Sequence, residues 1–492
     1  MNLADERLRG LDNPALNADE RATLRAQVAA DFIHKGRYEA AREALGEHWR
    51  EAGERPYVEG LGDRATAEVL LQAGVLSGWL GKVKGAQDAA KDLISESAAL
   101  FERLGETAKA AFARSDLALC YWREGAYDEA RILLARASEE LAEADAERRA
   151  IVLLRWVTVE CAARRLHDAL GILKESEHIL RTSENNALLG SFHNLYAVTL
   201  RRLGAVEGHG DYYDRAIIEY TAAVYHYEQA RHERYTARIE NNLAFLLYRL
   251  GRYAEAHEHL DRAQSIFTRL RDAVCLAQVD ETRARVLVAE RKYRDAERTL
   301  AGAVKTLERG DESALLAEAL TLQGIIWARL WEYQDSINAL RRAAEMAESV
   351  GARVTAGQAV LALIEEHGAT WRLRPSEVFE GYQRADQLLK DSQDAEDIAR
   401  LRACAPIVMR RLTTVQLGDK NFTLPRAVHE FEAKLIERAL EESGGSVTSA
   451  ARLLGLTHQT LNSILHTRHK QLTAKRKPIE KRRKSIIKIP KE

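Results

Sequence analysis

Apolar residues recur along most of the chain at helical spacing, and short turns separate the stretches that carry them. Around Tyr253, for example, IENNLAFLLYRL precedes the residue and AEAHEHLDRAQSIFTRL follows it. Positions three and four apart share one face of a helix, so each stretch predicts a helix with one buried side. The pattern therefore indicates pairs of helices joined by tight turns.

A short phrase recurs at the turn inside each pair: Gly or a basic residue, any residue, Tyr, any two residues, Ala. It occurs as GRYEAA from Gly36, GAYDEA from Gly125, GRYAEA from Gly251 and RKYRDA from Arg291. Taking the Tyr or its equivalent as a marker gives successive gaps of 48, 41, 39, 47, 40, 40 and 40 residues. The markers are Tyr38, Ala86, Tyr127, Leu166, Tyr213, Tyr253, Tyr293 and Tyr333. This recurrence supports six or seven helix pairs, in which the small residue three positions after the marker lets the second helix press against the first.

This pattern, over roughly residues 20 to 370, resembles the tetratricopeptide repeat, although the unit is longer than the usual length of about 34 residues. The resemblance implies a helical solenoid whose concave face, lined by the first helix of each pair, holds a peptide or protein. Three glycines in GAVEGHGDY, before Tyr213, predict a loop insertion.

The residues expected on that inner face lie eleven positions before the markers: Asp116, Arg155, Asn242 and Thr282. The Asn242 amide can both donate to and accept from a bound peptide backbone. The alternative is that these are polar residues exposed in a groove without a ligand.

A different pattern begins after residue 370. Residues 371–414 are expected to form two bridging helices, and residues 415–424 a linker. A new helix is then expected to begin at Pro425. The first turn of a helix leaves its backbone N–H groups without partners inside the helix, so the N–H that proline lacks is not needed there. The apolar stripe of this helix comprises Val428, Phe431, Leu435, Ile436, Ala439 and Leu440, and the sequence Ser443-Gly444-Gly445 ends it.

The segment VTSAARLLGLTHQTLNSILH, residues 447–466, has the requirements of a helix-turn-helix. Ala451 is small where the helices cross, Gly455 tolerates positive φ in the turn, and Thr457 can cap the second helix. Apolar residues that hold the second helix are Ala450, Leu454, Leu456, Leu461 and Ile464. Some helical hairpins without a role in DNA binding share part of this pattern.

With the preceding helix, EFEAKLIERALEESGGSVTSAARLLGLTHQTL resembles the Fis-type DNA-binding domain that also closes many bacterial enhancer-binding activators. The match spans about residues 424–472. The resemblance implies dimerisation through the helix of residues 425–442 and reading of the major groove by the second helix of the motif. Those activators carry an ATPase domain, whereas no Walker motif occurs here.

On the proposed recognition helix, the residues directed away from Leu461 and Ile464 can face base edges: His458, Gln459, Asn462, Ser463 and His466. Gln459 and Asn462 are the first candidates, because a side-chain amide can make a bidentate contact with adenine. Residues better suited to phosphates are Thr457, Arg468, His469 and Lys470.

Charge is distributed unevenly along the chain. The formal net charge is -1, but residues 443–492 alone have an excess of ten positive charges. The last twenty residues, 473–492, are too densely charged to fold by themselves, so they predict a flexible basic arm. Its clusters, which would grip phosphates nonspecifically, are Lys475, Arg476, Lys477, Lys481, Arg482, Arg483 and Lys484. The alternative is a solvated tail.

Composition and the absence of known motifs indicate the fold class and exclude several classes of function. Abundant Ala, Leu, Glu and Arg with only seven prolines favour an all-α fold. The sequence shows neither a signal peptide nor a stretch long enough to span a membrane, and Cys120, Cys161, Cys275 and Cys404 are too far apart for a zinc or redox motif. No motif of an enzyme, a metal site or a cofactor site is found.

We therefore expect a cytoplasmic, nucleoid-associated bacterial transcriptional regulator. Residues 1–370 would form the array, which acts as a sensor or binds a peptide or protein partner and takes part in oligomerisation. Residues 425–472 would bind double-stranded DNA as a homodimer. The alternative hypothesis is an interaction scaffold whose basic end binds RNA, membrane lipid or a protein.

Overall fold

The computed structural model describes residues 16–34, 36–80, 85–141, 145–310, 312–390, 392, 394–413 and 423–476. Within these residues every regular element is a helix. They form two compact units, one of residues 1–372 and 380–405 and one of residues 373–379 and 406–492. Each unit is described by itself.

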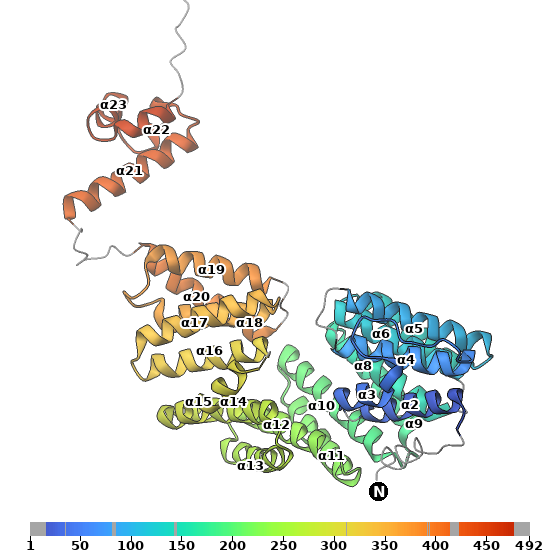
Figure 1. The fold of residues 1–492 in the computed structure, drawn as a ribbon. Coiled ribbons are helices and arrows are strands. Elements are labelled where there is room, and N and C mark those ends of the chain that lie inside the picture. Colours follow the sequence, from blue (N-terminus) through green and yellow to red (C-terminus); the bar gives the residue numbers. More distant parts are fainter. Residues whose placement is uncertain are drawn as a thin grey trace, which may run out of the picture. The chain divides into compact units, whose positions relative to one another are not determined.

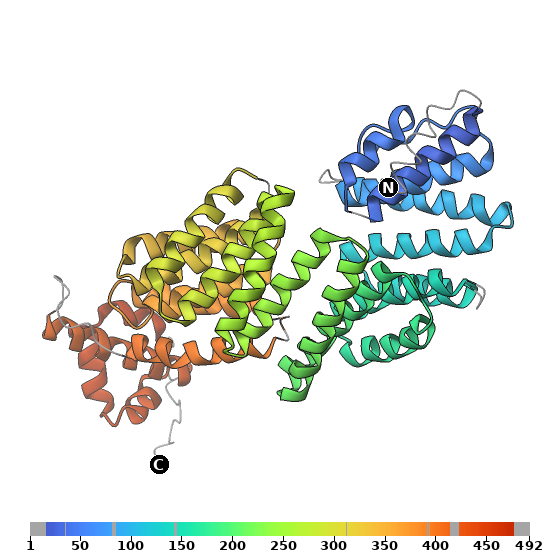
Figure 2. The same cartoon turned by 90° about the horizontal axis from the view of Figure 1, so that it is seen from below.

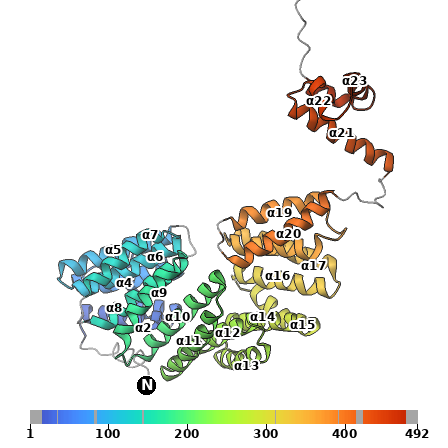
Figure 3. The same cartoon turned by 180° about the vertical axis from the view of Figure 1, so that it is seen from behind.

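In the first unit, each helix packs on its neighbours along the chain, so that antiparallel pairs stack one after another (Figures 1, 2 and 3). The predicted helical solenoid is thus confirmed. The helices are α2 (Ala18–His34), α3 (Tyr38–Leu45), α4 (Asp63–Leu80), α5 (Ala86–Arg103), α6 (Thr107–Glu124), α7 (Tyr127–Glu140), α8 (Ala146–Ala162), α9 (Leu166–Leu180), α10 (Asn186–Glu207), α11 (Gly210–Gln229), α12 (Glu233–Arg249), α13 (Tyr253–Leu270), α14 (Ala273–Ala289), α15 (Tyr293–Glu308), α16 (Ser313–Arg329), α17 (Tyr333–Ser349) and α18 (Arg353–His367), with the short 3-10 helix η1 (Gly46–His48) after α3.

Two helices, α19 (Pro375–Leu389) and α20 (Ala395–Thr413), occupy the stretch where two bridging helices are predicted. The C-terminal helices are α21 (Leu424–Glu442), α22 (Val447–Leu453), α23 (His458–Thr467) and the 3-10 helix η3 (Lys470–Lys475).

The recurrence of Gly at the start of the turn phrase is explained by the backbone conformation at that position. The residue two positions before the marker has a positive φ, which glycine adopts freely and other residues adopt at a cost. These residues are Gly36, Gly125, Arg164, Gly251, Arg291 and Trp331. In the second pair the positive φ belongs to Gly85 instead, so the marker there is Gln87 rather than the predicted Ala86. Consistently, Ala90, three residues after Gln87, is fully buried.

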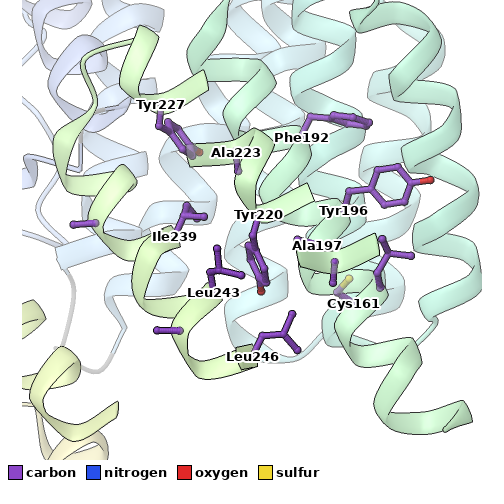
Figure 4. Close-up of a cluster of buried hydrophobic side chains, with 14 of the residues drawn as sticks. Cys161, Phe192, Tyr196, Ala197, Tyr220, Ala223, Tyr227, Ile239, Leu243 and Leu246 are labelled. Atoms are coloured by element: carbon purple, nitrogen blue, oxygen red, sulfur yellow. The ribbon is translucent and has the colours of Figure 1, made fainter. Parts of the chain in front are cut away.

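The predicted loop insertion before Tyr213 is wrong. The extra residues lengthen two helices, since α10 has 22 residues and α11 has 20, and only Gly208 and His209 lie between them. Figure 4 shows the core that this long pair builds with α12, in which Tyr220 lies between Leu243 and Ala197. Burial of apolar surface against α12 therefore outweighs the tendency of the glycines to form a loop.

A small residue nine positions before each marker sets the distance between the two helices of a pair. These residues are Ala29, Gly78, Ala118, Val157, Gly204, Ala244, Ala284 and Gly324, and all are buried. At Gly324 an added Cβ would lie 2.5 Å from Leu340 Cγ and 3.2 Å from the Ser336 carbonyl oxygen. The turn phrase predicted the small residue of the second helix but not this small residue of the first.

Gly324→Ala is expected to lower the free energy of unfolding by about 2 kcal/mol, because the methyl group forces α16 and α17 apart. Gly302→Ala is a matched control: its Cβ would meet nothing within 4 Å in α15, and alanine should stabilise that helix by about 0.5–1 kcal/mol. Urea denaturation of both variants measures the difference. Equal shifts in the same direction would contradict the close-packing explanation.

Candidate nucleic-acid interface and partner-binding face

The C-terminal helices are positioned by side-chain caps. The hydroxyl of Thr423 accepts from the Arg426 N–H at 3.3 Å and that of Ser446 from the Ser449 N–H at 3.4 Å. Thr457 accepts from the Thr460 N–H at 3.1 Å and so begins α23, as predicted. Each cap satisfies a donor that the helix itself leaves free. The turn before α23 contains Gly455 at φ +69°, the conformation for which glycine was expected there.

A small core holds the three helices together. Its buried residues are Ile436, Ala439, Leu440, Val447, Ala450, Ala451, Leu461, Leu465 and Leu472. Ala451 is 1% exposed at the predicted crossing, and Leu454 and Ile464 are half-buried. Leu456 was predicted to help hold α23 but is exposed, whereas the fully buried Leu465 was missed.

The outer side of α23 carries the predicted base-reading residues. His458, Gln459, Ser463 and His466 are exposed, and Asn462 is half-buried. Of these, the Asn462 and His466 side chains already accept hydrogen bonds from Arg476. Gln459 and Ser463 present polar groups to solvent, so they are the freest of the set.

Arg476 bridges two predicted base-reading residues. It donates from Nη2 to Asn462 Oδ1 at 2.9 Å and from Nη1 to His466 Nε2 at 3.0 Å. Because Asn462 Oδ1 is occupied, its Nδ2 group remains to donate outward. Arg476 was predicted to lie in a flexible arm, and nothing in the local sequence indicated this contact.

His469 is not a phosphate contact, contrary to prediction, because its side chain is fully buried. Its Nε2 donates to Glu432 Oε2 at 2.9 Å, and its ring centroid lies 4.2 Å from that of His429 on α21. Arg468 donates to the same carboxylate at 3.1 Å. The hydrogen bond from His469 and the charge of Arg468 lower the pKa of Glu432. This cluster joins α21 to the end of α23.

Residues 473–475, the first residues of the predicted arm, belong to a 3-10 helix. Residues 470–475 form η3, and the Lys475 ammonium pairs with Glu437 at 2.6 Å and Glu441 at 2.5 Å on α21. These hydrogen bonds raise the pKa of Lys475. Lys470 and Thr457 are exposed. The other predicted basic residues, Lys477, Lys481, Arg482, Arg483 and Lys484, lie outside the described residues.

Half of the apolar stripe predicted on α21 is not covered by other described residues. Ile436, Ala439 and Leu440 face the core, but four apolar side chains spaced four, three and four residues apart lie in solvent. They are Leu424, which was not part of the predicted stripe, and Val428, Phe431 and Leu435, with exposed fractions of 68%, 58%, 64% and 45% in that order. This set is called the α21 stripe below.

The four predicted inner-face residues fall into two places. Asp116 Oδ1 and Arg155 Nη2 form an ion pair at 2.7 Å between α6 and α8, and the Arg155 guanidinium lies 4.5 Å from the Phe112 ring centroid. Thr282 is buried, and its hydroxyl donates to the Gln278 carbonyl oxygen at 3.1 Å. Only Asn242 has no side-chain hydrogen bond to another described residue.

Asn242 and Thr282 line one cavity of about 500 Å³. Charged side chains surround it, including Arg201 of α10, Arg238 and Arg249 of α12, and Glu318 of α16. Burial raises the pKa of Glu318, with a smaller contribution from the charge of Glu281. The cavity is thus suited to a polar or charged ligand.

Arg155 lines a second cavity, of about 710 Å³, whose wall is more apolar. Helix α2 contributes Asp31 and His34, although it is about 200 positions away in sequence from His232 and Tyr235, at the start of α12, which line the same cavity. Burial and the charge of Arg155 lower the pKa of His34. Sequence periodicity could not identify a wall built from such distant segments.

The described residues contain neither a membrane-spanning helix nor a metal-binding cluster. No helix there is long and apolar enough to cross a bilayer. No group of three or more His, Cys, Asp or Glu side chains there is arranged to hold a metal ion.

Comparison with known proteins agrees with this architecture. The family model "Bacterial regulatory protein, Fis family" matches residues 427–462, and a tetratricopeptide repeat model matches residues 235–309. The comparison with curated protein sequences finds no significant match.

Among solved structures, the chain is similar to aspartyl phosphate phosphatase F from Bacillus subtilis, with 12% identity, a TM-score of 0.50 and coverage of 78% of this chain and 97% of that one. The apo form of the quorum sensor NprR from B. thuringiensis gives 16% identity, a TM-score of 0.47 and coverage of 70% and 92%. Yeast Tom70 gives 13% identity, a TM-score of 0.45 and coverage of 84% and 88%. At these identities the likeness concerns the fold alone. The chain therefore joins an array of tetratricopeptide repeats to a C-terminal helix-turn-helix domain of the Fis family of bacterial regulatory proteins.

Proposed function

We propose that this protein is a transcriptional regulator that binds specific DNA sites as a homodimer and binds a protein partner along the inner face of its repeats. The observation that carries the proposal is α23, a capped helix of a Fis-type domain whose outer side presents Gln459, Asn462 and Ser463. We assign the chain no catalytic role, and we expect it to act at the nucleoid, in the cytoplasm.

Base reading would be divided between two kinds of contact. Gln459 is exposed, and its amide can form the bidentate contact with adenine. Asn462 is held by Arg476, so its free Nδ2 group and the neighbouring guanidinium together present only donors. Guanine offers two acceptors, O6 and N7, in the major groove. We therefore expect Asn462 and Arg476 to favour guanine at one position of each half-site.

Contacts with the DNA backbone would come from Thr457, Arg468, Lys470 and Lys475, and from the basic residues that follow Arg476. Of these, Arg468 and Lys475 have carboxylate partners on α21, which phosphates would have to replace. Lys470 is exposed, so it can reach a phosphate without breaking an ion pair. Such contacts strengthen binding to all sequences.

Selection of the full chain on a pool of random duplexes tests the proposal, and failure to enrich any sequence would refute it. Gln459→Ala and Asn462→Ala are each expected to weaken binding to the selected site about tenfold, without changing nonspecific binding. Lys470→Ala should weaken binding to all duplexes alike and lower the salt dependence by about one ion. Gln471→Ala, which removes an exposed amide outside α23, is the control.

The variant Arg476→Ala tests whether Arg476 helps to read a base or contacts a phosphate. If Arg476 orients Asn462, the variant should lose the preference for guanine at one position per half-site and accept adenine there, because Asn462 Oδ1 becomes free to accept. The same selection, repeated with this variant, measures the change. A loss of affinity spread evenly over all sequences would assign Arg476 to the backbone contacts instead.

Partner binding is supported by the position of α12 between the two cavities. Its N-cap residue His232 and Tyr235 of its first turn line the more apolar cavity, while Arg238, Asn242 and Arg249 line the charged one. An extended segment of a partner could place apolar and polar side chains in succession along this helix. A photo-crosslinking residue at position 242 should capture the partner in cells, whereas the same residue at Glu258, exposed on α13, should not.

A further inference from the structure

The first turn of α20 lies against the inner face of the repeats. Glu396 forms an ion pair with Arg249, the last residue of α12, although the two are 147 positions apart. Asp397 accepts from Gln358 Nε2 of α18 at 2.9 Å and from the Ser392 hydroxyl at 3.0 Å. These contacts hold an acidic segment of the chain against helices that belong to other repeats.

The same segment forms part of the charged cavity. Asp394, Glu396 and Asp397 line it together with Arg201, Arg238 and Asn242. Asp394 also lines a second hollow on α10, beside Arg201 and Arg202. The segment thus reaches from α12 to α10 across the inner face, where a bound peptide would lie.

The charges of this face favour an acidic ligand. Arg249 is neutralised by Glu396, but Arg238 has no carboxylate partner among the described residues and only approaches the Tyr235 ring, at 6.0 Å from its centroid. An acidic peptide could pair with Arg238 and also compete for Arg249. The competition is feasible because the Arg249 and Glu396 side chains are 42% and 49% exposed, and such ion pairs contribute little net free energy.

We propose that Ser392 and residues 394–400 are an internal occupant of the inner groove, and that an acidic segment of a partner protein binds the groove by displacing them. This inference rests on the proposed partner-binding function and specifies the chemistry of the partner. It also implies regulation, because α20 ends at Thr413, ten positions before the cap residue of the DNA-binding domain, Thr423. A partner that releases the start of α20 would act on the segment that leads to that domain.

A buried cysteine of α20 can report whether this segment is displaced. Cys404 is fully buried in α20, and burial raises the pKa of its thiol to about 11. Since only the thiolate reacts with alkylating reagents, Cys404 should react slowly while α20 is packed. Cys120 of α6 is also buried and lines neither of the two hollows that this segment lines, so it serves as the internal reference.

The experiment adds a fluorescent peptide with the sequence of residues 392–400, SQDAEDIAR, to the full-length protein. We expect the peptide to bind Glu396→Gln about fivefold or more tightly than the unmodified chain, because Arg249 is vacated, and Arg238→Gln at least about tenfold more weakly than that chain. The peptide SQNAQNIAR, which lacks the acidic groups, should not bind. Addition of the acidic peptide should speed alkylation of Cys404, located by mass spectrometry, but not of Cys120.

Three results would overturn the inference: equal binding of the acidic and neutral peptides, equal affinity for the unmodified chain and Glu396→Gln, or an unchanged rate at Cys404. Circular dichroism of each variant checks that it is folded. DNA selection with the same preparations keeps the two proposals distinct. If no duplex is enriched while the peptide results hold, the regulator proposal fails and the groove assignment stands; the reverse pattern refutes the groove assignment alone.

Discussion

Replacement of Phe431 with glutamate is expected to leave the DNA-binding domain folded but to make the protein monomeric. Phe431 is 64% exposed at the middle of the α21 stripe, so its side chain contributes little to the core of its own subunit. The spacing of Leu424, Val428, Phe431 and Leu435 is that of residues at which two helices meet. A buried glutamate facing its symmetry copy would be costly. The dimer, not the fold, should therefore be lost.

Loss of the dimer should greatly weaken DNA binding. When two linked domains contact two half-sites, the second contact is intramolecular, so the dimer can bind at least about 100-fold more tightly than one domain. Phe431→Glu is expected to lose affinity for the selected duplex by about this factor, while binding to a single half-site changes little. Sedimentation of the full chain and competition binding measure the two effects.

The control is Arg426→Gln, which also lowers the net charge by one but lies five residues earlier, on the opposite side of α21. Arg426 is exposed, and among the described residues its only ion pair is with the exposed Glu430. This variant should stay dimeric. A Phe431→Glu protein that sediments as a dimer and binds the two-site duplex normally would show that the α21 stripe has another role.

Local features of the C-terminal domain were predictable from sequence. The cap of Thr457, the positive φ of Gly455 and the burial of Ala451 each follow from residues within a few positions of one another. Short-range hydrogen bonds and backbone sterics decide such features, so the identity of the residue is sufficient. The repeating turn phrase was predictable for the same reason.

Features that depend on tertiary packing were not predictable. Arg476 reaches Asn462 across fourteen positions, and His469 is buried by Glu432 and His429 of α21. In sequence both residues belong to a basic stretch, and only the approach of α21 to the end of α23 decides which basic residues are solvated. The same holds for Asp116 and Arg155, whose predicted places on the inner face did not reveal that they bind each other.

Acid is expected to destabilise the C-terminal end of the repeat array through His367. This side chain is fully buried in α18, and its Nε2 lies 2.7 Å from the Ser336 hydroxyl, which itself donates to the Gly324 carbonyl oxygen. His367 Nε2 is therefore the nitrogen that carries the hydrogen, and Nδ1 is buried with no hydrogen-bond partner in the part of the chain that the structure describes. A second proton would place a charge at Nδ1 with nothing to stabilise it.

The direction of the effect follows from the two pKa values. Burial, helped by the charge of Arg372, lowers the pKa of His367 from 6.5 to about 4 in the folded protein. Between these values the unfolded chain binds the proton and the folded chain does not. The contribution of His367 is therefore fully present above pH 6.5 and is lost as the pH falls toward 4, amounting to about 2 to 3 kcal/mol by pH 4.5.

His367→Gln should reduce this pH dependence, because an amide can still donate to Ser336 but cannot take up a proton. Urea denaturation of the full chain at pH 7.5 and pH 4.5 measures it: the stability lost on acidification should be smaller in the variant by about 2 to 3 kcal/mol. His178→Gln, which removes an exposed histidine of α9, tests whether the loss of any imidazole gives the same result. If both variants lose as much stability in acid as the unmodified chain, the buried imidazole of His367 is not what makes the array sensitive to acid.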